Sequence, residues 1–283
     1  MRFLSLLNSA VLFTTLGIVH NVNAQVEFKG KFEQGALVRG NVPVGSEVKL
    51  NGKPLKVTPK GHFAMGFERE AAAEQMLEVI YPSGLTELKP LKIASREYKI
   101  DRVSGISQKI MKPDPVAQAR AAQDAKQTRA ARDTFIDNDA FMQDFIWPAT
   151  GRISGVYGSQ RVYNDVPGNP HYGVDVARPT GTVVVSPADG VITLAVPDMF
   201  YSGGTLIIDH GYGVSSTFLH LSKIYAKNGD VVTQGQKLAE IGATGRVTGP
   251  HLDWRLNWFQ MRLDPVSIVP PMSSVLAAEK TAN

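Results

Sequence analysis

Histidine and aspartate side chains gather in the carboxy-terminal half of this 283-residue chain, which contains six histidines in all. Imidazole and carboxylate groups bind divalent metals, and imidazole also moves protons near neutral pH. Their clustering between residues 171 and 253 is a first indication of a metal-dependent site. The residues are His171, Asp175, His210, His220, His251 and Asp253.

Two short runs have the spacing that would direct such side chains into one cleft. The run NPHYGVDVARP is too rich in glycine and β-branched residues, and too closely flanked by prolines, to form a helix. In an extended chain His171, Gly173 and Asp175 share one face, and the glycine leaves space for a metal between the other two. His251 and Asp253 share a face in the same way, so two strands can each present a pair of ligands.

Either pair alone is a weak pattern. A loop hydrogen bond between His171 and Asp175, with His251 and Asp253 on an unrelated strand end, would explain each separately. Their combination in one domain favours the metal. A catalytic zinc needs three imidazole or carboxylate ligands and an open fourth position for water. The chain contains no cysteine, which excludes a closed site made of thiolates.

The elements that must position these residues are strands. Residues 146–270 contain segments such as TVVVSPADGVITLAV, GGTLIIDH and HLDWRLNW, closely punctuated by glycine and proline, and they predict an antiparallel β domain. Residues 25–105 alternate between apolar and polar positions and predict a smaller antiparallel β domain with an accessory role. Between them, residues 106–145 predict a linker with a weakly amphipathic helix whose charges form a solvated face, although a partner-binding helix is an alternative. Residues 271–283 are a tail, and the fold class is mainly β.

The first 24 residues place Arg2 before an apolar run, which is followed by Val22 and Ala24. This predicts a cleavable export signal that ends at Ala24 and an extracytoplasmic, periplasmic or secreted, protein. A membrane anchor is the alternative, but Asn8, Ser9 and Thr14 dilute the run below what a stable span needs. The formal net charge of +4 is spread along the sequence without a Lys/Arg block, which argues against a nucleic-acid partner.

Four motifs occur in an order that resembles the lysostaphin-type, or LytM-like, zinc endopeptidases over residues 150–265. They are HYGVD, DHGYGVSSTFLHL, GDVVTQGQKLAEIGATG and GPHLDWRLNW. The resemblance implies a compact antiparallel β fold of the duplicated hybrid motif type. It also implies that His171 and Asp175 bind Zn²⁺, that His220 and His251 are catalytic, and that His210 has a supporting structural role. The implied substrate is the peptide stems of peptidoglycan.

The sequence departs from the family pattern at Asp253, where a second histidine of a His-x-His motif would be the third zinc ligand. Aspartate oxygen is itself a zinc ligand at a similar bond length, so we expect Asp253 to complete the metal site. A second carboxylate lowers the net charge of the site and should weaken its Lewis acidity. We therefore expect an exported zinc endopeptidase that cuts peptidoglycan cross-links, with the division machinery or another wall hydrolase as a partner.

Three alternatives remain open at this point. A LytM-like domain could bind the wall without catalysis and activate another hydrolase. A phosphohistidine carrier on a similar β fold is disfavoured by the export signal, because its phosphodonors are cytoplasmic. Trp254, Trp258 and Phe259 could line a substrate groove, but aromatic residues beside a strand favour the core.

Overall fold

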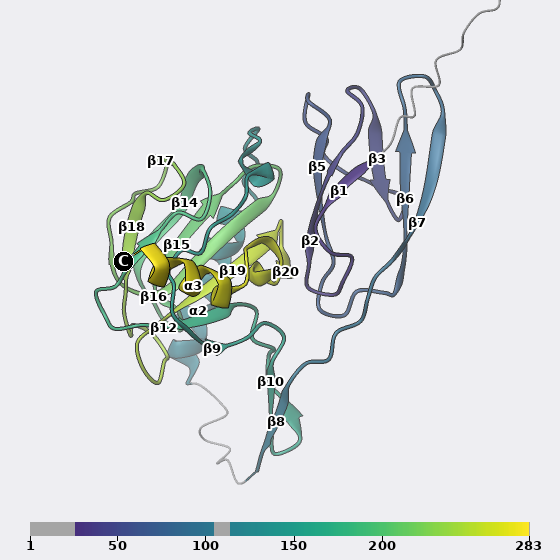
Figure 1. The fold of residues 1–283 in the computed structure, drawn as a ribbon. Coiled ribbons are helices and arrows are strands. Elements are labelled where there is room, and N and C mark those ends of the chain that lie inside the picture. Colours follow the sequence, from purple (N-terminus) through teal and green to yellow (C-terminus); the bar gives the residue numbers. More distant parts are fainter. Residues whose placement is uncertain (1–25, 105–113, 283) are drawn as a thin grey trace, which may run out of the picture.

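The computed structural model describes residues 26–104 and 114–282, and it places two β domains side by side (Figure 1). The expected export signal, residues 1–24, lies outside the described residues. The mainly β fold class is confirmed. Among the described residues, no helix is long and apolar enough to cross a membrane.

The amino-terminal domain is built from two small antiparallel sheets. One has the strand order β1-β2-β5 and the other β4-β3-β6-β7. The inward side chains of both sheets form a shared core that includes Phe63, Met65 and Leu77. The alternation read from the sequence is present in β3, β6 and β7, whereas β2 and β5 are buried at consecutive positions because they also pack against the larger domain. Their bounds are β1 Glu27–Lys29, β2 Leu37–Asn41, β3 Glu47–Leu50, β4 Lys53–Pro54, β5 His62–Gly66, β6 Glu74–Ile80 and β7 Thr86–Lys92.

The carboxy-terminal domain contains one large sheet whose central order is β17-β14-β15-β16-β19-β12-β9. Strands β15 and β16 are buried along most of their length, including Ser215, Ser216 and Thr217 of β16. Strand β13 pairs with β18, which also pairs with β16, and β20 pairs with β19. The bounds are β9 Arg152–Gly155, β12 Val174–Ala177, β13 Val183–Val185, β14 Gly190–Met199, β15 Gly203–Asp209, β16 Val214–Ile224, β17 Val231–Val232, β18 Lys237–Ile241, β19 His251–Trp258 and β20 Met261–Leu263.

A small sheet links the two domains. Strand β8, Ile100–Val103, follows the amino-terminal domain and pairs in parallel with β10, Gln160–Tyr163, which in turn pairs with β11, Val166–Pro167. The core of the larger domain also includes Leu37 and Ala64 from the smaller one. The domains therefore share an apolar contact as well as a strand pairing.

The core interpretation of the aromatic residues holds for Trp254. Its side chain is fully buried, its indole nitrogen donates to Ser216 Oγ at 3.2 Å, and its ring packs edge-on against Trp147. Trp258 and Phe259 are partly buried. Such packing leaves the other face of β19 to carry polar side chains.

Helix α2, Pro115–Arg132, lies against strands β14 and β15 (Figure 1). It begins at Asp114, whose side chain accepts from the Ala117 amide, and Pro115 occupies the first turn, where proline is tolerated. The prediction that its charges form a solvated face is wrong at Arg132, which is 6% exposed. Docking against the sheet buries the carboxy-terminal end of the helix, and Ala131 packs on Leu194 and Ile207 there.

Short helices complete the carboxy-terminal domain. They are η1 Ala140–Met142, η2 Pro265–Ile268 and α3 Met272–Ala282, the last within the segment set apart as a tail. Met272 is buried and Val275 and Leu276 pack against the domain core. The indole nitrogen of Trp147 also donates to the Pro270 carbonyl at 2.8 Å. This end of the chain is thus part of the folded domain.

Candidate metal centre

Strands β12 and β19 bring the two predicted pairs together. The antiparallel register sets Asp175 opposite Asp253, and His171 precedes β12. His171 Nε2 lies 3.1 Å from Asp175 Oδ1 and 3.6 Å from Asp253 Oδ2. One ligand atom from each of these residues lies within 4.8 Å of the others. His171, Asp175 and Asp253 therefore form a single donor cluster.

His171 and the two histidines beside the cluster are held in the same way by backbone carbonyl groups. In each, Nδ1 contacts a carbonyl oxygen, which can only accept, so Nδ1 carries a proton and Nε2 is the ring nitrogen left for other partners. This is the arrangement by which a ligating histidine is oriented. The contacts are His171 to Val156 at 3.3 Å, His220 to Thr244 at 2.9 Å and His251 to Gly249 at 2.9 Å.

His220 and His251 lie next to each other at the edge of the cluster. Their ring centroids are 4.9 Å apart, and His251 Nε2 is 3.8 Å from Asp175 Oδ1. His220 has a φ of 65°, where the pairing of β15 with β16 shifts register. A positive φ at a non-glycine residue is strained and is enriched at functional sites. Burial is the main reason that the pKa of His220 is lowered, so its imidazole favours the neutral form.

Asp253 has a second partner that the sequence reasoning missed. Arg255 donates to it through Nε at 3.0 and 3.1 Å and through a terminal nitrogen at 2.6 Å. Asp253 is 2% exposed, and burial alone would raise the pKa of its carboxyl group. The charge of Arg255, with His171, outweighs burial and lowers that pKa. Residues 253 and 255 share a strand face, which is the sequence signal for this pair.

Without a metal, His171 is positively charged. Burial by itself would lower the pKa of His171, but hydrogen bonds to Asp175 and Asp253 outweigh it and raise the pKa to about 10. Positive charge beside these two carboxylates is therefore favoured, whether a protonated His171 or a metal ion supplies it.

The donor set fits a divalent metal. Asp175 Oδ1 is buried and faces two imidazole nitrogens, His171 Nε2 at 3.1 Å and His251 Nε2 at 3.8 Å. One imidazole nitrogen and two carboxylate oxygens converge there, and they are common ligands of zinc. Arg255 is a competitor for one of the carboxylates, but it also limits the excess negative charge.

Two glycines make room for the carboxylates. A Cβ atom at Gly155 would lie 2.1 Å from Asp175 Oδ2, and one at Gly173 would lie 2.3 Å from Asp253 Oδ1. Gly173 was expected to leave space for a metal between His171 and Asp175. That interpretation is wrong in detail, because the Asp253 carboxylate and the Arg255 side chain fill this space.

His210 lies outside the cluster, in the core. It is fully buried, with Nδ1 2.7 Å from the Asp189 carbonyl and Nε2 2.9 Å from Ser216 Oγ. Burial lowers its pKa to about 4. These contacts agree with the supporting structural role expected from the sequence.

An antiparallel β domain with this donor set is the arrangement expected of a metallopeptidase domain. Residues 169–265 match the profile of Peptidase family M23. The carboxy-terminal domain is an M23 peptidase domain of the LytM type, which confirms the resemblance seen in the motifs.

Curated relatives share this domain over part of their length. The chain is 45% identical over 87 residues to peptidoglycan DD-endopeptidase ShyA of Vibrio cholerae, covering 31% of this chain and 20% of that protein. It is 38% identical over 112 residues to DD-carboxypeptidase/endopeptidase Mpg of Neisseria meningitidis, covering 40% of this chain and 26% of that protein. The chain thus spans about a fifth to a quarter of the length of these relatives.

One solved structure is similar over both domains. It is the crystal structure of a Pseudomonas aeruginosa protein whose description places it with peptidase M23. The TM-score is 0.65 at 28% identity, and the match covers 84% of this chain and 95% of that one. The two-domain arrangement is therefore shared with that protein.

Proposed function

We propose that the protein is an exported zinc endopeptidase that hydrolyses peptide cross-links of peptidoglycan. The observation that carries the proposal is the convergence of His171 Nε2, Asp175 Oδ1 and Asp253 Oδ2, with His220 and His251 beside them. The substrate class follows from curated relatives that are named as peptidoglycan DD-endopeptidases or as a DD-carboxypeptidase/endopeptidase. Residues 1–24 would be the export signal, and residues 25–105 an accessory domain.

His171, Asp175 and Asp253 would hold the metal, which when bound polarises a peptide carbonyl and lowers the pKa of a water molecule. The contribution of the chain itself is positioning and proton transfer. The backbone carbonyls of Gly249 and Thr244 orient the Nε2 atoms of His251 and His220. These imidazoles can act as the general base for the attacking water and hydrogen-bond the oxyanion that develops on the substrate.

The test combines metal analysis with product analysis. We expect the purified protein to bind one zinc ion, and to release shortened peptides from purified sacculi. His220→Ala and His251→Ala should keep the metal and lose at least 100-fold of the rate, since general acid–base groups contribute roughly that much. His62→Ala, in the amino-terminal domain, is the matched control. Full activity in either active-site variant would refute their catalytic role.

A second candidate function is a regulator that binds the wall without hydrolysing it and activates another hydrolase. The observation that favours it is the three hydrogen bonds from Arg255 to Asp253, because a carboxylate engaged by arginine is less available to a metal. A zymogram on purified sacculi separates the two functions. Clearing by the purified protein alone supports the peptidase, whereas clearing that requires a second hydrolase supports the regulator.

A further inference from the structure

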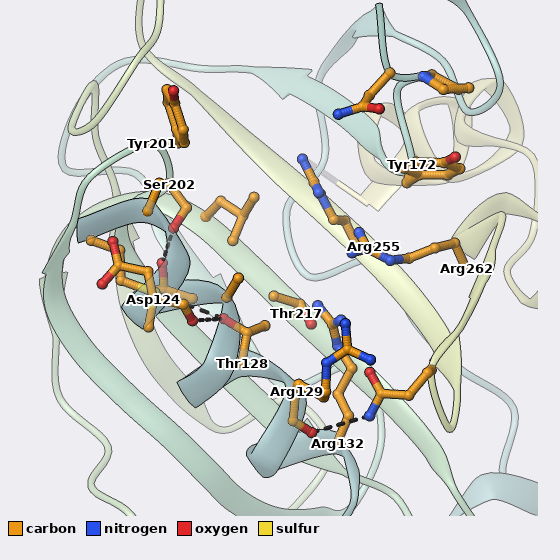
Figure 2. Close-up of a pocket in the computed structure, with 18 residues that line it drawn as sticks. Asp124, Thr128, Arg129, Arg132, Tyr172, Tyr201, Ser202, Thr217, Arg255 and Arg262 are labelled. Atoms are coloured by element: carbon orange, nitrogen blue, oxygen red, sulfur yellow. Dashed lines mark hydrogen bonds between the residues drawn. The ribbon is translucent and has the colours of Figure 1, made fainter. Parts of the chain in front are cut away.

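Figure 2 shows the residues that line a cavity of about 500 Å³. The cavity adjoins the metal centre at Arg255. Helix α2 forms one wall, and strands β16, β19 and β20 contribute the side chains opposite. Arg255 connects the cavity to the metal centre, because it lines the cavity and donates a hydrogen bond to Asp253. A ligand in the cavity would therefore lie one side chain away from the proposed metal ligands.

Arginine side chains meet in this cavity from two directions. Arg129 and Arg132 come from helix α2, and Arg255 and Arg262 come from β19 and β20 (Figure 2). Of the described residues that line it, the one acidic side chain is Asp124, and its carboxylate accepts from the Phe200 amide at 2.7 Å. The wall of the cavity thus carries an excess of positive charge.

Arg132 is the arginine of this cavity that most needs a negatively charged partner. Its side chain is 6% exposed, and its Nε atom is buried without a hydrogen-bond partner among the residues the structure describes. Among the described residues, Arg132 takes part in none of the arginine ion pairs, and an isolated buried charge is costly. Burial first, and then the charges of Arg262 and Arg255, lower the pKa of Arg132 to about 9.

The other arginines do not remove this imbalance. Arg262 packs over the Tyr172 ring, 5.2 Å from its centroid, and Arg129 is solvent-exposed. Arg255 alone has a carboxylate partner, Asp253. An anion placed between Arg132 and Arg262 would satisfy groups that the chain leaves unsatisfied.

We propose that this arginine pocket binds a carboxylate of the peptide substrate, within one or two residues of the bond that is cleaved. The proposal rests on the peptidase function. Guanidinium groups bind carboxylates through two parallel hydrogen bonds, and the stem peptides of the wall carry free carboxylates. Met199 and Leu219 on the cavity wall suit the aliphatic part of such a residue. Selection for an anionic residue beside the scissile bond is the expected consequence.

The experiment measures binding and not hydrolysis. Isothermal titration of the metal-loaded full chain uses a synthetic uncross-linked wall tetrapeptide, either with free carboxylates or with every carboxylate amidated. We expect the free acid to bind at least tenfold more tightly than the amide. Arg132→Met should abolish this preference by weakening the acid at least tenfold while leaving the amide unchanged, and Arg262→Gln is the second variant.

Arg120→Gln is the matched control, because Arg120 lies on the same helix but pairs with Asp198 and does not line the cavity. It should bind both peptides as the wild type does. Equal affinity for acid and amide in the wild type, or an Arg132→Met variant that still prefers the acid, overturns the proposal. Inorganic phosphate that binds more tightly than the acid would also overturn the assignment to a peptide carboxylate.

Failure of this proposal is distinguishable from failure of the peptidase function. If the wild type binds the acid selectively but releases no peptides from sacculi, the pocket stands and catalysis does not. If it hydrolyses the wall but binds acid and amide equally, the pocket proposal fails alone. Loss of folding is not expected in Arg132→Met, since removal of an unpaired buried charge should raise its melting temperature.

Discussion

Asp175 and Asp253 lie directly opposite each other on neighbouring antiparallel strands. Like charges in directly opposed positions destabilise a sheet, so the pair requires positive charge close by. His171 bridges the two carboxylates, and Arg255 binds Asp253. A site with two aspartates and one arginine carries the same net charge as a site with one aspartate. Arg255 thus offsets the extra carboxylate at the position where the family pattern has histidine.

Replacement of Arg255 by methionine should destabilise the metal-free protein by about 3 kcal/mol, because it leaves a buried carboxylate without its main partner. Zinc should then raise the melting temperature of the variant more than that of the wild type, since the metal replaces the missing positive charge. Differential scanning calorimetry with and without zinc measures both effects. Arg255→Lys is the control and should retain part of the stability. An unchanged melting temperature in Arg255→Met would contradict this account.

Replacement of Asp253 by asparagine should weaken zinc binding at least tenfold, because the amide oxygen is a neutral and poorer ligand than the carboxylate. It also leaves the Arg255 charge facing the metal. Competition with a chromophoric chelator gives the affinity. Asn257, farther along β19 and hydrogen-bonded to the Met261 carbonyl, provides an Asn257→Ala control that should bind zinc normally. Zinc binding that survives Asp253→Asn unchanged would remove Asp253 from the ligand set.

Replacement of Gly173 by alanine should damage the site through a steric clash. The added Cβ would lie 2.3 Å from Asp253 Oδ1 and 2.8 Å from the Trp254 backbone oxygen, and overpacking of this kind costs about 1–3 kcal/mol. Zinc affinity should fall together with stability, because the Asp253 carboxylate must move. Gly249→Ala is a matched control, since its Cβ would meet nothing within 4 Å. Normal zinc affinity in Gly173→Ala would show that the clash is relieved without moving Asp253.

Much of the fold and the position of the cluster could be predicted from local sequence. The alternation of apolar residues indicates strands, and the two-residue period places His171 with Asp175 and His251 with Asp253. The pairing of β12 with β19 could not be predicted from strand periodicity, because periodicity does not say which strands are neighbours or in what register they pair.

Other features could not be predicted because they depend on tertiary packing. The position of Arg132 on a polar helix suggests a solvated side chain, and only the docking of α2 on β14 and β15 buries it. The role of Gly173 was misjudged for the same reason, since the group that fills its space comes from β19. Contacts between residues far apart in sequence decide both cases.

Asp209 and His210 should give the protein opposite responses to acid. The folded pKa of His210 lies at about 4 because burial disfavours its charge, so its contribution to stability is present above its unfolded value of about 6.5 and is lost as the pH falls. Burial raises the pKa of Asp209 to about 6, so its contribution is lost as the pH rises through that value. The two effects nearly cancel between pH 6.5 and pH 4.

His210→Asn removes the histidine effect. The free energy of unfolding of this variant, relative to the wild type, should therefore rise by about 2–3 kcal/mol as the pH falls from 7 to 4.5. Urea unfolding at both pH values measures this change, and NMR of the wild type should show a His210 imidazole that stays neutral down to about pH 5. A His210 signal that titrates near pH 6.5 would contradict the assignment of a buried neutral histidine.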